Sequence, residues 1–188
     1  IVNEIRETTD GIISYEKYEE VIEKVIGYYK ALCPNIRYIE CCNEVEIDCF
    51  GGLSAKEYYE LYKCAYRAVR KLNAKNNYSI PLEVGGFAMS GCISRWSMWQ
   101  EFLELLAADN SPEKKVDFFS MHDYSPNMYR IMDFYIRHKN MVKKLNLPNV
   151  PLFINEYGTT HATEVLTENL QNASGIISGM IMGSHLEN

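Results

Sequence analysis

Short apolar runs alternate with longer amphipathic segments along most of the chain. Apolar residues recur at helical spacing in five segments, which are 15–32, 55–72, 95–108, 128–145 and 163–182. The short apolar runs between them predict strands over 36–42, 80–84, 116–121 and 150–154. Ser54-Ala55-Lys56-Glu57 has the pattern of a capping box and marks the start of one helix. Strands and helices that alternate at this length predict an α/β fold with a parallel sheet.

Polar residues gather where each predicted strand ends. They are Asn43-Glu44, Gly85-Gly86, His122 with Tyr124, and Asn155-Glu156. Neither a GxGxxG turn nor a P-loop is present, so a nucleotide-binding sheet is disfavoured. The active site of a (β/α)8 TIM barrel lies at the carboxyl ends of its strands, and such a barrel needs about 250 residues. We therefore expect residues 1–188 to form a single, partial TIM-barrel catalytic domain that covers about strands 4–7.

Charge and cysteine content narrow the classes of partner. The chain has 19 Lys and Arg against 25 Asp and Glu, a net charge of −6, without a basic cluster. This balance argues against nucleic acid and favours a neutral or cationic small substrate. No apolar run approaches the length of a membrane-spanning helix. The six cysteines lack the spacing of a zinc site, and we expect them to be reduced core residues. Reduced cysteines slightly favour the cytoplasm, but the compartment stays open.

Alternation along the predicted strands brings two carboxylates to one rim. Side chains two positions apart share a face of a strand, so each strand can be extended to the polar residue at its tip. The residues that this places at the rim are Glu44, His122, Tyr124 and Glu156. Two carboxylates that flank one site are what glycoside hydrolysis requires.

The segments around these residues resemble a known group of enzymes. Residues 38–44 (YIECCNE) look like the strand-4 signature of clan A retaining glycoside hydrolases, and residues 153–157 (FINEY) resemble their nucleophile segment. Residues 58–62, 82–86, 99–103 and 116–124 are similar to glycoside hydrolase family 39, which includes β-xylosidases and α-L-iduronidases. Cys42, Val45 and Phe87 depart from the family pattern, and these departures bear on the choice of sugar.

The resemblance implies a xylosidase-like enzyme that cleaves O-glycosidic bonds with retention, without a metal or cofactor. It implies that Glu44 is the general acid/base and Glu156 the nucleophile. Tyr124 would donate a hydrogen bond to Glu156, and Asn43 would bind the sugar 2-hydroxyl. His122 would contact the sugar or Glu44. Tyr157 would line the substrate site.

Two other functions fit the same residues. Glu44, Glu156 and His122 could hold a metal ion in a sugar isomerase or epimerase, and a non-catalytic relative would bind carbohydrate without turnover. We also expect the missing strands to come from a longer chain or a partner, without which this segment is inactive.

Several further residues are given structural roles. We expect Glu40 to be a hydrogen-bonded or ion-paired structural carboxylate. Glu46 and Asp48 could bind a cation, but we expect them to belong to an exposed acidic loop. We expect His138 and His161 to lie at the surface, and Trp96 and Trp99 to serve packing.

Overall fold

Four parallel strands form one sheet in the order in which they occur along the chain, β1-β2-β3-β4. The computed structural model describes residues 11–91, 93–125, 127, 129–159 and 170–186. The strands are β1 (Tyr38–Glu40), β2 (Glu83–Met89), β3 (Phe118–Tyr124) and β4 (Leu152–Gly158). The helices are α2 (Tyr15–Leu32), α3 (Ala55–Asn76), α4 (Trp96–Ala108), α5 (Tyr129–Lys144) and α6 (Leu170–His185), and a short 3-10 helix, η1, spans Asp48–Phe50.

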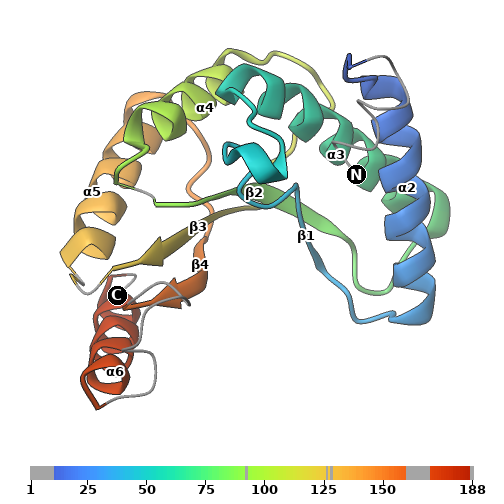
Figure 1. The fold of residues 1–188 in the computed structure, drawn as a ribbon. Coiled ribbons are helices and arrows are strands. Elements are labelled where there is room, and N and C mark those ends of the chain that lie inside the picture. The colour runs from blue at the N-terminus through green and yellow to red at the C-terminus, as the bar shows by residue number, and fades with distance from the viewer. Residues whose placement is uncertain (1–10, 92, 126, 128, 160–169, 187–188) are drawn as a thin grey trace.

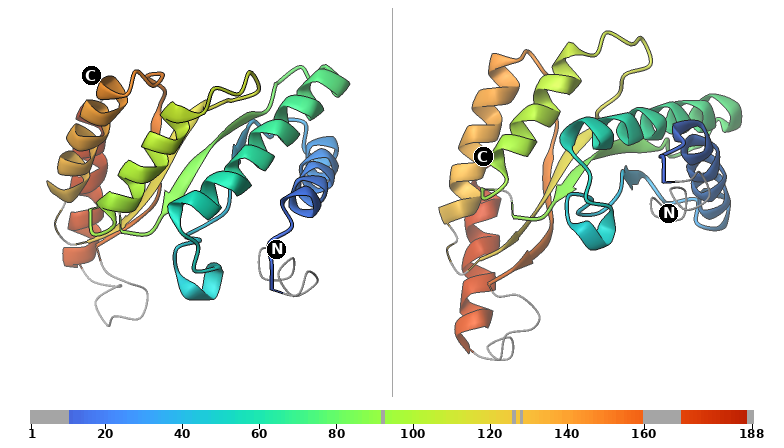
Figure 2. Two further views of the ribbon diagram at one scale, coloured as in Figure 1. Left: turned by 90° about the horizontal axis from the view of Figure 1, so that it is seen from above. Right: turned by 45° about the horizontal axis from the view of Figure 1, so that its top comes forward.

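The sheet curls strongly, and α3, α4 and α5 follow one another over its outer, convex side (Figure 1). Figure 2 shows the same helices lying side by side along the sheet. Sequential order with the helices on one side is the arrangement of a barrel wall, whereas a doubly wound sheet has helices on both faces. The architecture is therefore a parallel half-barrel, which confirms the predicted fold class.

Aromatic side chains fill the space between the strands and the outer helices. Trp99 of α4 and Tyr58 of α3 are completely buried, and Phe87 of β2 stacks on Tyr58 with the ring centroids 4.1 Å apart. The predicted capping box is present, because the Ser54 hydroxyl accepts from the backbone of Glu57 while the Glu57 carboxylate accepts from the backbone of Ser54. Within the described ranges, none of the helices combines the length and the apolar character needed to cross a membrane.

Contacts across the concave face show how far the sheet curls. Tyr38 of β1 and Phe153 of β4 lie 5.2 Å apart between ring centroids, although the two strands are not neighbours in the sheet. Nearby, Asn155 Nδ2 donates to Glu40 Oε2 at 2.6 Å. This bond confirms the prediction that Glu40 is a hydrogen-bonded structural carboxylate. The carboxyl ends of all four strands therefore surround a small region.

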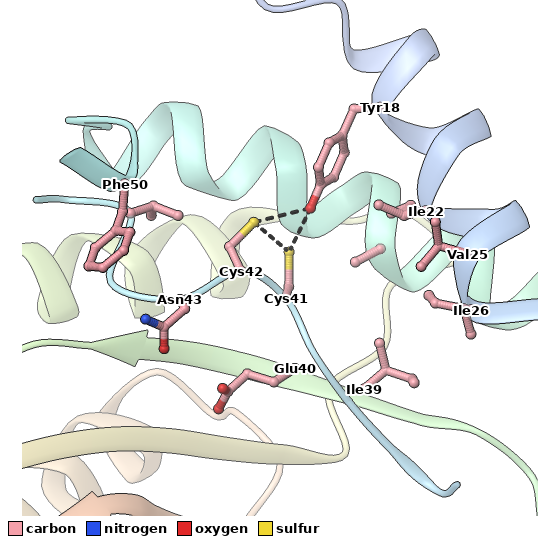
Figure 3. Close-up of a pocket in the computed structure, with 12 residues that line it drawn as sticks. Tyr18, Ile22, Val25, Ile26, Ile39, Glu40, Cys41, Cys42, Asn43 and Phe50 are labelled. Carbon is pink, nitrogen blue, oxygen red and sulfur yellow. Dashed lines mark hydrogen bonds between the residues drawn. The ribbon is translucent and has the colours of Figure 1, made fainter. Parts of the chain in front are cut away.

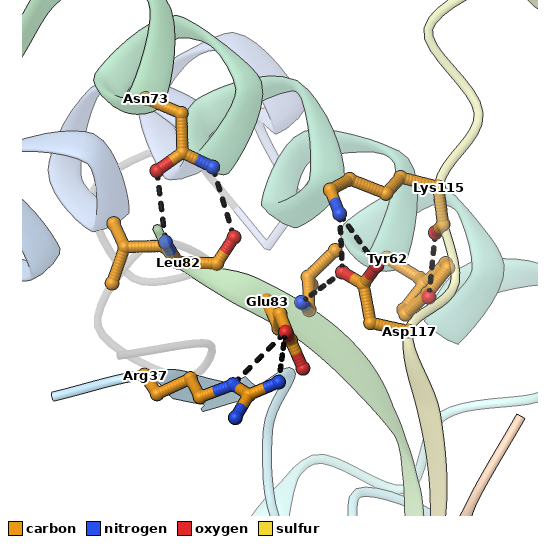
Figure 4. Close-up of polar contacts among 8 residues, drawn as sticks. Arg37, Tyr62, Asn73, Leu82, Glu83, Lys115 and Asp117 are labelled. Carbon is orange, nitrogen blue, oxygen red and sulfur yellow. Dashed lines mark hydrogen bonds and ion pairs between the residues drawn. The ribbon is translucent and has the colours of Figure 1, made fainter. Parts of the chain in front are cut away.

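The amino ends of the strands are fixed by polar contacts (Figure 4). Arg37 donates two hydrogen bonds to Glu83 Oε1, and Lys115 forms an ion pair with Asp117. The Asn73 side chain both donates to and accepts from the backbone of Leu82. These contacts lie at the end of the barrel wall that usually serves stability rather than catalysis.

The predicted ends of β2, β3 and β4 were too early, most clearly in β2, whereas β1 ends at Glu40, before its predicted end at residue 42. Gly85 and Gly86 were expected to break the strand, but both lie inside it. A Cβ atom on Gly85 would lie 2.3 Å from the Phe118 carbonyl oxygen, and one on Gly86 would lie 2.2 Å from the Tyr58 hydroxyl. The glycines thus permit close approach of neighbours and do not form a turn.

His138 and part of the cysteine set also differ from expectation. His138 is buried in α5, where its Nδ1 accepts from Trp99 Nε1 at 3.3 Å, and burial lowers its pKa to about 4. His161 lies outside the described residues. Cys41 and Cys64 are buried and unpaired as predicted, whereas Cys33 and Cys49 are exposed. Trp99 packs in the core as expected, and Trp96 packs edge-to-face on Phe134.

Candidate active site

Glu44, His122 and Glu156 meet at the carboxyl ends of the strands. His122 Nδ1 lies 2.8 Å from Glu44 Oε1 and 3.5 Å from Glu156 Oε2. One oxygen of each carboxylate and one ring nitrogen of His122 all lie within 4.8 Å of one another. The His122 side chain is fully buried, while those of Glu44 and Glu156 are 14% and 38% exposed. The structure thus brings together three residues that the sequence placed at one rim.

Glu44 is held in the loop that follows β1. Its backbone N–H donates to the Ala88 carbonyl in β2, and its own carbonyl accepts from Ile47. The φ angle of Glu44 is 45°, in the left-handed region that non-glycine residues rarely adopt. Such strained residues occur most often at functional sites, where the surrounding structure imposes the conformation.

Glu156 is positioned by an irregularity in the pairing of β3 with β4. Met121 pairs with Ile154, but the next residue, His122, pairs with Glu156, so the register shifts by one residue at Asn155. Alternation of side chains from Ile154 predicted correctly that Glu156 lies at the rim. It did not predict the register shift at Asn155 that places Glu156 opposite His122. Without the shift, Asn155 would oppose His122.

Tyr124 is the second group that contacts Glu156. Its hydroxyl donates to Glu156 Oε2 at 3.0 Å, the contact that the resemblance implied. Burial raises the pKa of Tyr124, and the hydrogen bond to the Glu156 carboxylate raises it further. The phenol therefore stays protonated and remains a donor throughout the neutral range.

A cavity of about 550 Å³ opens beside these residues, and both carboxylates line it. Tyr124 also lines it, together with Arg95 from the loop that follows β2 and Arg130 from the first turn of α5. The volume is in the range of small-molecule sites. The cavity can therefore admit a sugar unit against both carboxylates.

Glu46 supports this site and was not predicted to do so. The sequence suggested an exposed acidic loop, but the Glu46 side chain is buried while Asp48 is exposed. Glu46 Oε1 accepts from both the backbone N–H and the hydroxyl of Ser90. This correction has a physical reason, since the carboxylate ties the Glu44 loop to the loop after β2. The sequence carried no signal of that long-range contact.

Asn43 and Tyr157 do not line the cavity that holds the two carboxylates. Asn43 borders a separate, mostly apolar cavity of about 310 Å³ beside Cys41 and Cys42. Figure 3 shows the two thiols directed toward the Tyr18 hydroxyl and the Asn43 side chain directed away from them. The Tyr157 hydroxyl donates to the Gly175 carbonyl of α6 at 3.2 Å. The substrate-binding roles of Asn43 and Tyr157 stay predictions.

The three central residues could also hold a metal ion by their donor types, which are two carboxylates and one imidazole. However, His122 Nδ1 already lies at hydrogen-bond distance from Glu44. A carboxylate only accepts, so the nitrogen carries the proton when Glu44 is ionised. Nδ1 of His122 and the Glu44 carboxylate are thus already paired with each other, whereas His122 Nε2 is buried without a hydrogen-bond partner among the described residues.

Comparison with known proteins places this site in a family. The sequence model described as cellulase (glycosyl hydrolase family 5) matches residues 3–181. The predicted clan A of glycoside hydrolases is therefore confirmed, whereas the matching family is 5 and not the predicted 39.

Two solved structures align with the chain. A glucosidase from Croceicoccus marinus aligns with a TM-score of 0.69 at 17% identity, covering 92% of this chain and 36% of the glucosidase. A GH128 (subgroup VI) exo-beta-1,3-glucanase from Aureobasidium namibiae aligns with a TM-score of 0.47 at 15% identity, covering 70% of this chain and 45% of the glucanase. The chain thus spans about a third of the length of the glucosidase, and that likeness concerns the fold alone.

Proposed function

Because the chain belongs to the cellulase family, glycosyl hydrolase family 5, we propose that it carries both catalytic carboxylates of a retaining glycoside hydrolase. Glu156 is the nucleophile and Glu44 the general acid/base. The observation that carries this proposal is the separation of the two carboxylates, whose closest oxygens lie within 4.8 Å. Retaining enzymes hold their carboxyl groups about 5–5.5 Å apart, whereas inverting enzymes leave about 6.5–9.5 Å for a water molecule.

The reaction proceeds in two displacements. In the first, a Glu156 oxygen attacks the anomeric carbon while Glu44 gives its proton to the departing glycosidic oxygen. In the second, Glu44 takes a proton from water as the water oxygen attacks the same carbon and Glu156 leaves. The product sugar keeps the configuration of the substrate.

The surroundings of the two carboxylates suit these different roles. Tyr124 donates to Glu156, and a donor of this kind favours the ionised carboxylate that a nucleophile needs. Glu44 is the more shielded of the two and faces His122 Nδ1. The imidazole donates to Glu44 when the carboxylate is ionised and can accept from it when it is protonated. Glu44 can therefore gain and lose its proton without losing its partner.

We propose that the sugar is a six-membered ring of the xylose or glucose type. The resemblance that the sequence carries favours β-xylosides, and the name of the structurally similar glucosidase suggests glucosides as the comparison. Both rings fit a cavity of about 550 Å³.

A panel of nitrophenyl glycosides tests the proposal with the full-length protein that contains this chain. We expect turnover, and we expect Glu44→Gln and Glu156→Gln each to reduce kcat by about a hundredfold or more. Glu104→Gln is the matched control, because Glu104 is exposed on α4 and bonds only Gln100 among the described residues. Full activity in either active-site variant would overturn the proposal.

The same assay separates the alternatives. A chelator should leave nitrophenol release unchanged, whereas no release, together with a conversion of free sugars that needs a divalent metal, would favour the isomerase or epimerase. Sugar binding without turnover would favour the non-catalytic relative.

A further inference from the structure

Two guanidinium groups line the cavity that contains Glu44 and Glu156. Arg95 directly precedes α4, and Arg130 lies in the first turn of α5. Their side chains are 42% and 32% exposed. In the described part of the chain, neither forms an ion pair with Glu44 or Glu156. The proposed hydrolysis therefore leaves these two cations without a role.

Each arginine lies at ion-pair distance from a buried carboxylate. Arg95 Nε lies 3.6 Å from Glu46 Oε1, and Arg130 Nε lies 3.3 Å from Asp123 Oδ1. The side chains of Glu46 and Asp123 are 2% and 0% exposed. Both pairs approach through Nε, and the terminal nitrogens of both arginines have no hydrogen-bond acceptor among the residues that the structure describes. Those terminal N–H groups remain for a ligand.

A sugar that enters the cavity must replace the water on these groups. A buried donor that loses water without gaining an acceptor costs free energy, and a guanidinium group has several such donors. A neutral sugar would have to satisfy them with its hydroxyls, which also face Glu44, Glu156 and Tyr124. A carboxylate instead offers two coplanar oxygens that match the guanidinium fork.

We propose that the sugar bound here carries a carboxylate, so that the substrates are glycosides of uronic acids and Arg95 and Arg130 recognise the acid group. This inference rests on the proposed function and names its substrate class. The start of α4 supports it, because the positive end of that helix lies at Arg95 and no side chain of the described residues caps it. The net charge of −6 favoured a neutral or cationic substrate, whereas two guanidinium groups stand beside the two carboxylates in the lining of the cavity.

Three nitrophenyl β-glycosides test the inference because they differ only at C6. The xyloside lacks C6, the glucoside carries a hydroxymethyl group and the glucuronide carries a carboxylate. With the full-length protein we expect the highest kcat/KM on the glucuronide. Arg95→Gln and Arg130→Gln should each reduce the glucuronide-to-glucoside ratio of kcat/KM by about tenfold or more, the usual effect of losing a hydrogen bond to a charged group. Arg95→Lys keeps the charge but loses the fork and should recover only part of that ratio.

Arg37→Gln is the matched control, because Arg37 pairs with Glu83 at the opposite end of the strands and should leave the ratio unchanged. Calorimetry with free glucuronate and free glucose gives a readout that does not need turnover. Tighter binding of glucuronate that Arg95→Gln abolishes would support the inference, even if no glycoside were cleaved and the proposed function failed. Equal binding and equal turnover of the acidic and neutral sugars would overturn the inference while leaving glycoside hydrolysis intact.

Discussion

His122 on β3 pairs in register with Glu156 on β4, although its predecessor Met121 pairs with Ile154. Asn155 is the additional residue, and its side chain donates to Glu40 across the concave face. The shift brings a Glu156 oxygen to 3.5 Å from His122 Nδ1, the atom that also contacts Glu44. A local irregularity in strand pairing therefore helps to bring the two carboxylates together.

Tyr124→Phe should lower kcat while the protein stays folded. The change removes one hydrogen bond to the Glu156 carboxylate, and a hydrogen bond to a charged group contributes about 1.5–3 kcal/mol, which corresponds to roughly a 10–150-fold change in rate. Steady-state kinetics on the best substrate measures this effect. An unchanged kcat would show that Tyr124 does not support the nucleophile.

The raised pKa of Tyr124 adds a pH test to the same residue. Because burial and the bond to Glu156 favour the protonated phenol, the hydroxyl remains a donor up to and beyond pH 10. Below pH 10, the pH–rate profiles of the wild type and of Tyr124→Phe should therefore have the same shape. A loss of wild-type activity in this range that is absent in Tyr124→Phe would contradict this.

Gly85→Ala and Gly86→Ala should both destabilise the protein, but only the stability of Gly86→Ala should be restored by a second substitution, Tyr58→Phe. The new Cβ at position 85 would meet the Phe118 backbone, which cannot move without disturbing the sheet. At position 86 it would meet the Tyr58 hydroxyl, so Tyr58→Phe removes the clash at the cost of the bond to the Cys41 carbonyl. Thermal unfolding of the single and double variants measures the rescue. Equal recovery at both positions would contradict this explanation.

Much of the site was predictable because it depends on where strands end. Glu44, His122, Tyr124 and Glu156 each follow or close an apolar run, and parallel strands bring such residues to one edge. The Glu46–Ser90 contact was not predictable, because it joins two loops whose meeting depends on the completed fold.

Strand boundaries and faces were harder to predict than the order of the elements. Gly85 and Gly86 have the composition of a turn, and only the closeness of Phe118 and Tyr58 shows why they lie within β2. The register shift at Asn155 likewise depends on a partner on another strand. Local pattern contains no information about either contact.

His138 should make stability depend on pH. Burial, with a smaller effect of Lys139, lowers the pKa of His138 to about 4 in the folded protein, against an ordinary value of about 6.5. Between these values the unfolded chain binds a proton that the folded protein does not. The contribution of neutral, buried His138 to the free energy of unfolding is therefore fully present above about pH 6.5. As the pH falls toward 4, the free energy of unfolding decreases by about 3 kcal/mol in total.

Urea unfolding at pH 4.5 and pH 7 measures this dependence. His138→Gln keeps an acceptor for Trp99 but does not titrate in this range, so its midpoint should change less between the two pH values than that of the wild type. The same change in both proteins would assign the pH dependence to other groups.

Residues 1–188 expressed alone should fail to fold cooperatively and should show no turnover. In the described structure β1 and β4 are the edges of the sheet, and parallel strands are seldom stable with open edges. We therefore propose that further strands, from a longer chain or a partner, complete the barrel. A monomeric 188-residue protein that unfolds cooperatively and is fully active would contradict this proposal.

Trapping of the covalent intermediate tests the central claim most directly. A 2-deoxy-2-fluoro glycoside of the preferred sugar, with a good leaving group, should glycosylate the protein at one residue, as the aglycone departs, and increase its intact mass by one fluorosugar. Peptide mapping should place the sugar on Glu156, and Glu156→Gln should not be labelled. A label on another residue, or an enzyme that turns over its substrate with inversion and forms no adduct, would contradict the assignment of Glu156 as the nucleophile.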